Sequence, residues 1–161
     1  MRKIKKKKII LICSDGGHLA QILELRDWFT NYDYLLVTEM APSTIAYQDQ
    51  YNIKYLRGRS NGKSRSVGFF INILVNFFLT IKILVSHFPK AIITTGSHTA
   101  VPMCILGKLL GRKIIWILSF ARIDSRAFSA DLIYPIADKF ILQWPGPQRF
   151  YKKGIHLGGI Y

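Results

Sequence analysis

Short strand-like runs alternate with stretches of helical spacing along the whole chain. Residues 9–13 form a continuous apolar run, which is typical of a strand buried on both faces of a parallel sheet. The pattern predicts strands at residues 9–13, 34–38, 53–56, 91–95, 113–118, 139–143 and 155–157. It predicts helices at residues 18–30, 42–51, 67–87, from the turn at 96–99 through 110, and 126–137, with an irregular or briefly helical stretch at 145–153.

This alternation predicts a doubly wound α/β fold with a mainly parallel, Rossmann-like sheet. A length of 161 residues leaves room for one hydrophobic core. We therefore expect a basic tail at residues 1–8 and a single domain at residues 9–161. The apolar run that follows the tail is too short for an export signal.

Residues 67–87 form the most hydrophobic segment, and their number matches a membrane span. However, Asn72, Asn76 and Thr80 recur at helical spacing, and a span would put two halves of one domain on opposite sides of a bilayer. We expect a helix that packs partly on the sheet and partly in the lipid interface, with an ordinary buried helix as the alternative. The aromatic side chains expected to contact lipid are Phe69, Phe70, Phe77 and Phe78.

The net charge of the chain predicts an anionic partner. Twenty-three Lys and Arg against nine Asp and Glu give a net charge of +14, which suits a nucleic acid, a membrane surface or phosphate groups. The basic residues lie beside apolar segments and not among exposed aromatic residues, so nucleic-acid binding is disfavoured. The N-terminal lysines either form a solvated end or tether the chain to anionic lipid, and they include Lys5, Lys6, Lys7 and Lys8.

A first glycine turn lies between the predicted strand 9–13 and the helix after it. In such folds, ligands bind at the carboxyl edge of the sheet, where this turn stands. Gly16 and Gly17 allow backbone N–H groups to approach an anion, and Ser14 precedes them. His18 starts the helix, where the helix dipole lowers its pKa and favours a neutral base. A purely structural turn is the alternative interpretation.

A second glycine turn lies at the same predicted edge. Thr95 ends a strand, Gly96 fits a tight turn, and Ser97 and His98 lead into a helix. Ser97 can cap that helix, so a simple helix start is the alternative to a site for phosphate or sugar hydroxyls.

Two further residues follow strands at this edge. Arg122 can hold a phosphate with two parallel hydrogen bonds, or it can pair with Asp124. Trp144 can stack on a sugar ring, or it can close the end of the sheet.

Neither a metal nor a cofactor is expected. The histidines lack zinc-ligand spacing, and Cys13 and Cys104 lie in apolar runs, which is typical of buried reduced thiols.

Five motifs occur in register along nearly the whole chain. They are SDGGHL from Ser14, TTG from Thr94 with AVP from Ala100, SFAR from Ser119, YPIAD from Tyr134, and the pair Gln143 and Trp144. Together they resemble the family of the membrane-anchor subunit of the eukaryotic two-subunit N-acetylglucosaminyltransferase of dolichol-linked oligosaccharide assembly. The chain looks most similar to bacterial relatives of that family in capsular and exopolysaccharide synthesis.

The resemblance implies the N-terminal, acceptor-binding half of a GT-B glycosyltransferase, inactive alone and peripheral at the cytoplasmic face of the cell membrane. A separate subunit would bind the nucleotide sugar, and a lipid-diphosphate-linked glycan would be the acceptor. His18 would be the catalytic base. The residues expected to bind the acceptor are Ser14, Gly16, Gly17, Thr95, Gly96, Ser97, His98, Arg122 and Trp144.

The chain departs from the family pattern at two positions. Relatives often have a small residue where Asp15 stands, and a Glu where Leu118 stands. The missing Glu favours a second hypothesis, in which the chain is a non-catalytic enhancer that only docks and orients the catalytic partner.

Overall fold

The structure is a computed structural model that describes residues 6–58 and 67–161. In this part of the chain, seven strands form one sheet in the order β3-β2-β1-β4-β5-β6-β7, and every neighbouring pair is parallel. The strands are β1 (Lys8–Ile12), β2 (Asp33–Glu39), β3 (Ile53–Leu56), β4 (Ala91–Thr94), β5 (Lys113–Ile117), β6 (Lys139–Leu142) and β7 (Ile155–His156). The predicted strands are therefore all present.

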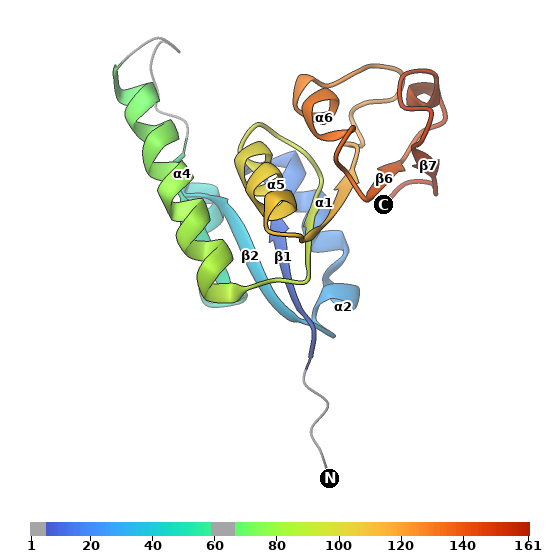
Figure 1. Ribbon diagram of the computed structural model, residues 1–161. Coiled ribbons are helices and arrows are strands. Elements are labelled where there is room, and N and C mark those ends of the chain that lie inside the picture. Colours follow the sequence, from blue (N-terminus) through green and yellow to red (C-terminus); the bar gives the residue numbers. More distant parts are fainter. Residues whose placement is uncertain (1–5, 59–66) are drawn as a thin grey trace.

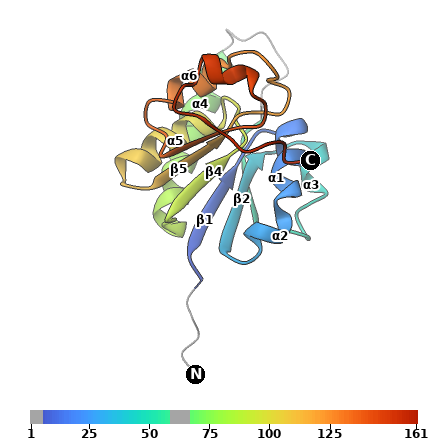
Figure 2. The same cartoon turned by 90° about the vertical axis from the view of Figure 1, so that its right-hand side faces the viewer.

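Helices cover both faces of the sheet, as the doubly wound prediction requires. Figure 2 shows α1, α2 and α3 on one side of the strands and α4 and α5 on the other. The helices are α1 (Gly17–Glu24), α2 (Arg26–Phe29), α3 (Pro42–Ile45), α4 (Val67–His87), α5 (Ala100–Leu109) and α6 (Phe128–Ile133), with a 3₁₀ turn η1 (Gly146–Arg149). In Figure 1, α4 runs beside α5, away from β6 and β7.

The uniform apolarity of β1 follows from its central place in the sheet. Its side chains alternate between two core clusters: Ile10 packs with Met103 of α5 on one face, and Leu11 packs with Phe29 of α2 on the other. All four side chains are fully buried. Burying one such side chain contributes about 1.5–3 kcal/mol to the free energy of unfolding, so both faces of β1 stabilise the fold.

The helix expected at residues 18–30 is interrupted at Leu25. The N–H of Leu25 donates to the carbonyl of Ile22 at 3.0 Å, three residues back instead of four. This tighter turn ends α1 and lets α2 start in a new direction, with Phe29 in the core. Periodicity alone did not reveal the break, because Leu25 continues the apolar pattern.

Two more expected helices are shorter than predicted. The helix at residues 42–51 is limited to α3, and Gln48 after it donates to the carbonyl of Ile45 at 3.0 Å in a three-residue turn. These turns bring Tyr47 and Tyr51 against the core, with ring centroids 6.0 Å apart. The helix expected at residues 126–137 is limited to α6.

The polar stripe of α4 faces the protein. The N–H of Arg57 donates to Asn76 Oδ1 at 2.8 Å, Asn76 Nδ2 donates to the carbonyl of Arg57 at 2.9 Å, and Thr80 is buried. The opposite face exposes large apolar side chains, among them Leu74, Phe77, Phe78 and Val85. The helix therefore packs partly on the fold, and the alternative of an ordinary buried helix is wrong. None of the helices in the described ranges is long and apolar enough to cross a membrane.

The expected basic tail lies partly outside the described residues, which begin at Lys6. Lys6 Nζ donates to the carbonyl of Thr30 at 3.1 Å, Lys7 is exposed, and Lys8 already belongs to β1. Lys5 and the side chains of Phe69 and Phe70 also lie outside the described part. The division into a tail and a single domain stays a prediction.

Candidate functional site

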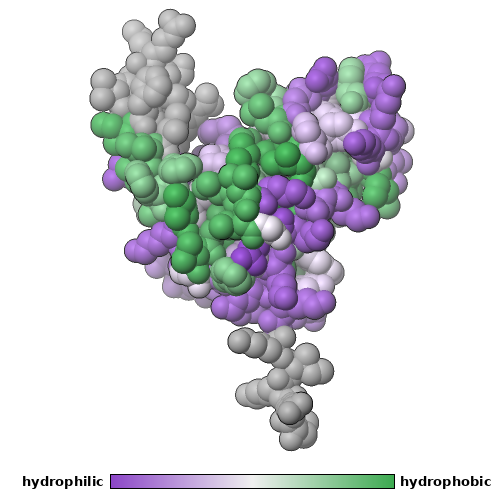
Figure 3. Space-filling view, viewed as in Figure 1, coloured by the Kyte–Doolittle hydropathy of each residue, from purple (hydrophilic) through white to green (hydrophobic). Residues whose placement is uncertain are grey.

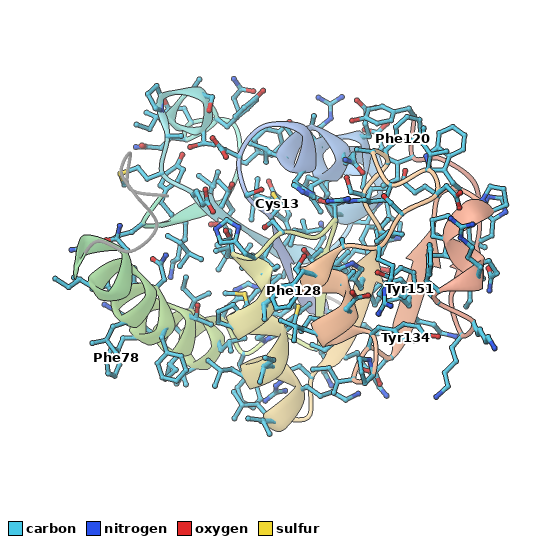
Figure 4. The ribbon with its side chains drawn as sticks, turned by 90° about the horizontal axis from the view of Figure 1, so that it is seen from above. Cys13, Phe78, Phe120, Phe128, Tyr134 and Tyr151 are labelled. Atoms are coloured by element: carbon cyan, nitrogen blue, oxygen red, sulfur yellow. The ribbon has the colours of Figure 1, made fainter. Side chains whose placement is uncertain are left out.

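The order of the strands places a topological switch point between β1 and β4. The chain builds the sheet from β1 toward β3 and then from β4 toward β7, so the connections diverge at the carboxyl ends of β1 and β4. Ligands of open α/β sheets bind in the crevice at such a point. A cleft of about 650 Å³ lies there, lined by residues that follow five of the strands. In Figure 4, which views this edge from above, Cys13 at the end of β1 and Phe128 of α6 lie near the middle of the molecule.

Most of the predicted site residues line this cleft. They are Ser14, His18, Thr95, Gly96, Ser97, His98 and Arg122. Both predicted turns therefore meet at one site, although they are separated by 77 positions in the sequence.

The second turn holds His18 by its ring and by its backbone. His18 Nδ1 lies 2.9 Å from the carbonyl of Thr95, and Thr95 Oγ1 donates to the carbonyl of His18 at 2.9 Å. Because a carbonyl only accepts, Nδ1 carries the proton and Nε2 is the free acceptor nitrogen. The imidazole is thus fixed in the tautomer that a general base requires.

The environment of His18 favours its neutral form. Burial lowers the pKa of His18 and the positive charge of Arg122 lowers it further, while the hydrogen bond to Thr95 opposes the shift. Both lowering effects act against a charged imidazolium. His18 is therefore a neutral base near pH 7.

Gly96 packs closely against His18 and Trp116. A Cβ at this position would lie 3.3 Å from His18 Cε1 and 3.4 Å from Trp116 Cζ2, and φ is +108°. Ser97 also has a positive φ of 93°. Within the described residues, Ser97 Oγ and Trp116 Nε1 are buried without a hydrogen-bond partner. The alternative of a helix start capped by Ser97 is wrong, because α5 has no side-chain cap and begins later, at Ala100.

Arg122 stands exposed at the rim of the cleft and does not pair with Asp124. Its Nη1 lies 3.4 Å from Ser125 Oγ, whereas Asp124 Oδ2 accepts from Arg149 Nη2 at 2.8 Å. The alternative of an Arg122–Asp124 ion pair is therefore wrong. The guanidinium of Arg122 is left available to an anion in the cleft.

Comparison of the sequence with known proteins identifies the family of this chain. The family model described as "Oligosaccharide biosynthesis protein Alg14 like" matches residues 9–160. This chain belongs to the Alg14 family. Its sequence is 25% identical over 178 residues to the human UDP-N-acetylglucosamine transferase subunit ALG14, a match that covers 94% of this chain and 82% of that protein.

Solved structures support the fold assignment of this Alg14-family chain. MurG of Acinetobacter baumannii matches with a TM-score of 0.67 at 17% identity, over 87% of this chain and 42% of MurG. The UDP-N-acetylglucosamine 2-epimerase of Rickettsia bellii matches with a TM-score of 0.72 at 13% identity, over 96% of this chain and 45% of the epimerase. The chain thus spans less than half the length of these proteins. The fold class, a Rossmann-like half of the GT-B type, is confirmed.

Other relatives in the Alg14 family carry the same subunit name and come from the yeasts Debaryomyces hansenii and Candida albicans and from the rat. The expected capsular or exopolysaccharide setting has no support among them.

Three predicted site residues lie outside the lining of the cleft. Gly16 and Gly17 stand at the exposed edge of the first turn, with nothing within 4 Å of the place where a Cβ would be. Trp144 Nε1 donates to the carbonyl of Phe120 at 2.7 Å, and the two rings lie 4.9 Å apart. Trp144 is therefore held against Phe120, outside the lining of the cleft.

Sequence reasoning missed Glu39, a buried acid in the cleft. It ends β2, accepts a hydrogen bond from Thr99 Oγ1, and has Oε1 3.6 Å from His98 Nε2. Its exposure is only 6%, and a buried carboxylate needs such partners. The available signal was an acid directly after the predicted strand 34–38, at the edge where ligands bind.

Two buried amide side chains, Gln21 and Gln143, connect α1 to the loop after β5. Gln21 of α1 accepts from Gln143 Nε2 and from the N–H of Phe120, both at 2.9 Å. Gln143 Nε2 also donates to the carbonyl of Leu118 at 2.9 Å. These bonds tie α1 to the loop that carries Arg122.

No cluster of three metal-ligating side chains occurs within residues 6–58 and 67–161. Cys13 and Cys104 are both buried, and burial raises the pKa of each thiol to about 12. These thiols belong to the core and not to the chemistry of the cleft.

Proposed function

We propose that this chain is the acceptor-binding, membrane-recruiting subunit of a two-chain glycosyltransferase. The enzyme would transfer a sugar from a nucleotide sugar to a lipid-diphosphate-linked glycan. The observation that carries this proposal is the cleft at the switch point, where the neutral His18 and the available guanidinium of Arg122 line one site. The subunit names of the relatives make UDP-N-acetylglucosamine the donor that we propose.

The cleft residues take separate parts in this reaction. Nε2 of His18 accepts the proton of the acceptor hydroxyl while its oxygen bonds to C1 of the donor sugar. The bond from C1 to the nucleotide diphosphate breaks, and the diphosphate leaves with the electron pair. Arg122 binds the diphosphate of the acceptor with two parallel hydrogen bonds. The separate partner subunit supplies the donor site.

The chain would sit peripherally on the cytoplasmic face of the membrane. The apolar outer face of α4 would enter the lipid interface, and the N-terminal lysines would add attraction to anionic headgroups. Flotation with anionic vesicles measures this association. Replacing Phe77 and Phe78 with Ser should release more protein than raising the salt concentration, because salt screens only the contribution of the lysines.

A substitution of Arg122 tests the acceptor site in the complex with the partner subunit. Arg122→Lys keeps the charge but loses the forked geometry, so the KM for the acceptor should rise about tenfold while the KM for the nucleotide sugar stays unchanged. Ser125→Ala is the matched control, because it removes only the 3.4 Å contact of Arg122. An equal rise in both KM values would contradict the proposed role and place Arg122 at the subunit interface.

The second candidate is a non-catalytic enhancer, which Leu118 in place of the Glu of relatives favours. Leu118 lines the cleft but is 98% buried in the core, so it offers no acid to the reaction. Unchanged turnover after replacement of His18 would support this candidate.

The capsular or exopolysaccharide setting stays a prediction. Transfer assays with bacterial polyprenyl-diphosphate sugars and with dolichyl-diphosphate N-acetylglucosamine would distinguish it from the dolichol pathway.

A further inference from the structure

A second hollow, of about 300 Å³, lies between α4, α5 and α6. We call it the α4–α6 groove. Its walls include Val101 and Pro102 of α5 and Phe128 and Leu132 of α6. These side chains are apolar, in contrast to the polar lining of the cleft at the switch point.

The groove is continuous with the cleft. Glu39, Gly58, His98 and Ser129 line both of them. A ligand that fills the cleft can therefore extend into the groove without crossing the surface of the protein.

The two asparagine side chains that line the groove contact the protein backbone. Asn76 exchanges two hydrogen bonds with the backbone of Arg57, and Asn72 Nδ2 lies 3.5 Å from the carbonyl of Gly58. An apolar occupant would leave the hydrogen bonds of these two asparagines intact.

The outer side of the groove leads to an apolar surface. Figure 3 shows hydrophobic side chains gathered over α4 and α5, with hydrophilic side chains over most of the rest of this face. Figure 4 shows Phe78 on the outer side of α4, far from Phe128. A hydrocarbon chain leaving the groove would meet this surface, which we have proposed to lie in the lipid interface.

We infer that the α4–α6 groove binds the hydrocarbon chain of the lipid-linked acceptor, next to its diphosphate. This inference rests on the proposed function and adds a subsite to it. Charged residues line both hollows: Arg122 lines only the cleft, Arg57 lines only the groove, and Glu39 lines both. The diphosphate lies in the polar cleft with Arg122, and the uncharged chain extends past Glu39 along the apolar side chains of α5 and α6.

The test compares two soluble acceptors with the same diphosphate-linked sugar, one on an ethyl chain and one on a decyl chain. Transfer from radiolabelled UDP-N-acetylglucosamine is measured with the complex of both subunits and without membranes. Burial of several methylenes should lower the KM for the decyl acceptor by about tenfold or more relative to the ethyl acceptor.

Two groove variants should remove this preference. Leu132→Asn replaces a half-exposed wall residue, and Phe128→Ser replaces an 80% exposed one whose loss leaves the core intact. Each should bring the KM for the decyl acceptor to that for the ethyl acceptor, with the ethyl value unchanged. Leu110→Asn is the matched control: Leu110 is 50% exposed, close to the 47% of Leu132, but lies at the far end of α5 from the groove.

The possible failures are distinguishable. Equal KM values for both chains in the unmodified complex would overturn the groove inference alone, and leave the proposed function standing. Absence of transfer to either acceptor would overturn the proposed function and the inference with it. Loss of co-purification with the partner in both groove variants would also overturn the inference, because the occupant would then be a segment of the partner.

Discussion

The two glycine turns look alike in the sequence but have different roles in the structure. Each follows a strand, contains a glycine and a histidine, and leads into a helix. The first turn is open, with nothing within 4 Å of a Cβ on Gly16 or Gly17. The second is tightly packed, since a Cβ on Gly96 would press on His18. The first turn therefore carries His18, and the second holds the ring of His18 in position.

This difference also separates the two histidines. His18 is held through Nδ1 by a backbone carbonyl, and burial lowers its pKa. His98 is largely exposed and its closest charged neighbour is the buried Glu39, at 3.6 Å. His18 thus has a fixed ring orientation and a pKa lowered by burial, and this is why we propose that the base stands in the first turn.

The largest effect is expected for His18→Ala in the two-subunit complex. Loss of the general base should lower kcat by about 10²–10⁴ with the complex intact. In the unmodified complex, kcat/KM should fall on the acid side with a midpoint below pH 6.5. The reason is that the base must be unprotonated and burial lowers the pKa of His18 from its usual 6.5. Steady-state transfer assays across pH measure both quantities. His98→Ala is the control, and an equal loss in that variant would remove the distinction between the two turns.

A smaller effect is expected for Gly96→Ala. The substitution demands a left-handed residue at φ +108° and pushes the new Cβ against His18 Cε1 and Trp116. We expect a loss of about 1–3 kcal/mol in the free energy of unfolding and a fall in kcat of about ten- to a hundredfold, because the base is displaced. Chemical denaturation and transfer assays measure the two effects. Unchanged kcat would show that the second turn does not position His18.

The sequence predicted the parts of the site that depend on strand ends. The apolar runs place Ser14 and Arg122 after predicted strands and Thr95 at the end of one, and parallel strands bring their carboxyl ends to one edge. The sequence did not predict which residues face the cleft at that edge. Trp144 turns away to bond the carbonyl of Phe120, and Glu39 turns inward to meet Thr99. Such choices depend on side-chain contacts between segments that are distant in the sequence.

The fold was predicted more completely than its helix ends. Strands are specified by short apolar runs, and these are clear in this chain. Helices such as α1 and α3 end in tight three-residue turns with no proline or glycine to mark them. The spacing of Asn72, Asn76 and Thr80 alone also did not show that this polar stripe of α4 faces the protein. Periodicity shows that two faces of a helix differ, but not which face packs on the fold.

An effect on kcat smaller than that of Gly96→Ala is expected for Thr95→Val. The shape is nearly kept, but the carbonyl of His18 loses its bond from Thr95 Oγ1 while the bond from His18 Nδ1 to the carbonyl of Thr95 remains. We expect about 1–3 kcal/mol lower stability, from the loss of a buried hydrogen bond, and a kcat reduced less than in Gly96→Ala. Thermal denaturation with transfer assays measures both. A loss of kcat as large as in His18→Ala would mean that the hydroxyl itself takes part in the reaction.

The smallest effect is expected for Gly17→Ala, and it tests whether the first turn is as open as it looks. Gly17 is the first residue of α1, is not among the residues with positive φ, and has open space around a new Cβ. Alanine is favoured over glycine in a helix by about 0.5–1 kcal/mol, so the free energy of unfolding should stay the same or rise slightly. Both KM values should change by less than about twofold, because Gly17 does not line the cleft. A rise in the acceptor KM alone, with unchanged stability, would show that the acceptor approaches the backbone of Gly17. In that case the first turn would bind the acceptor through its backbone in addition to carrying His18. The open space around Gly16 and Gly17 would then be part of the binding site, and not only a difference from the tightly packed Gly96.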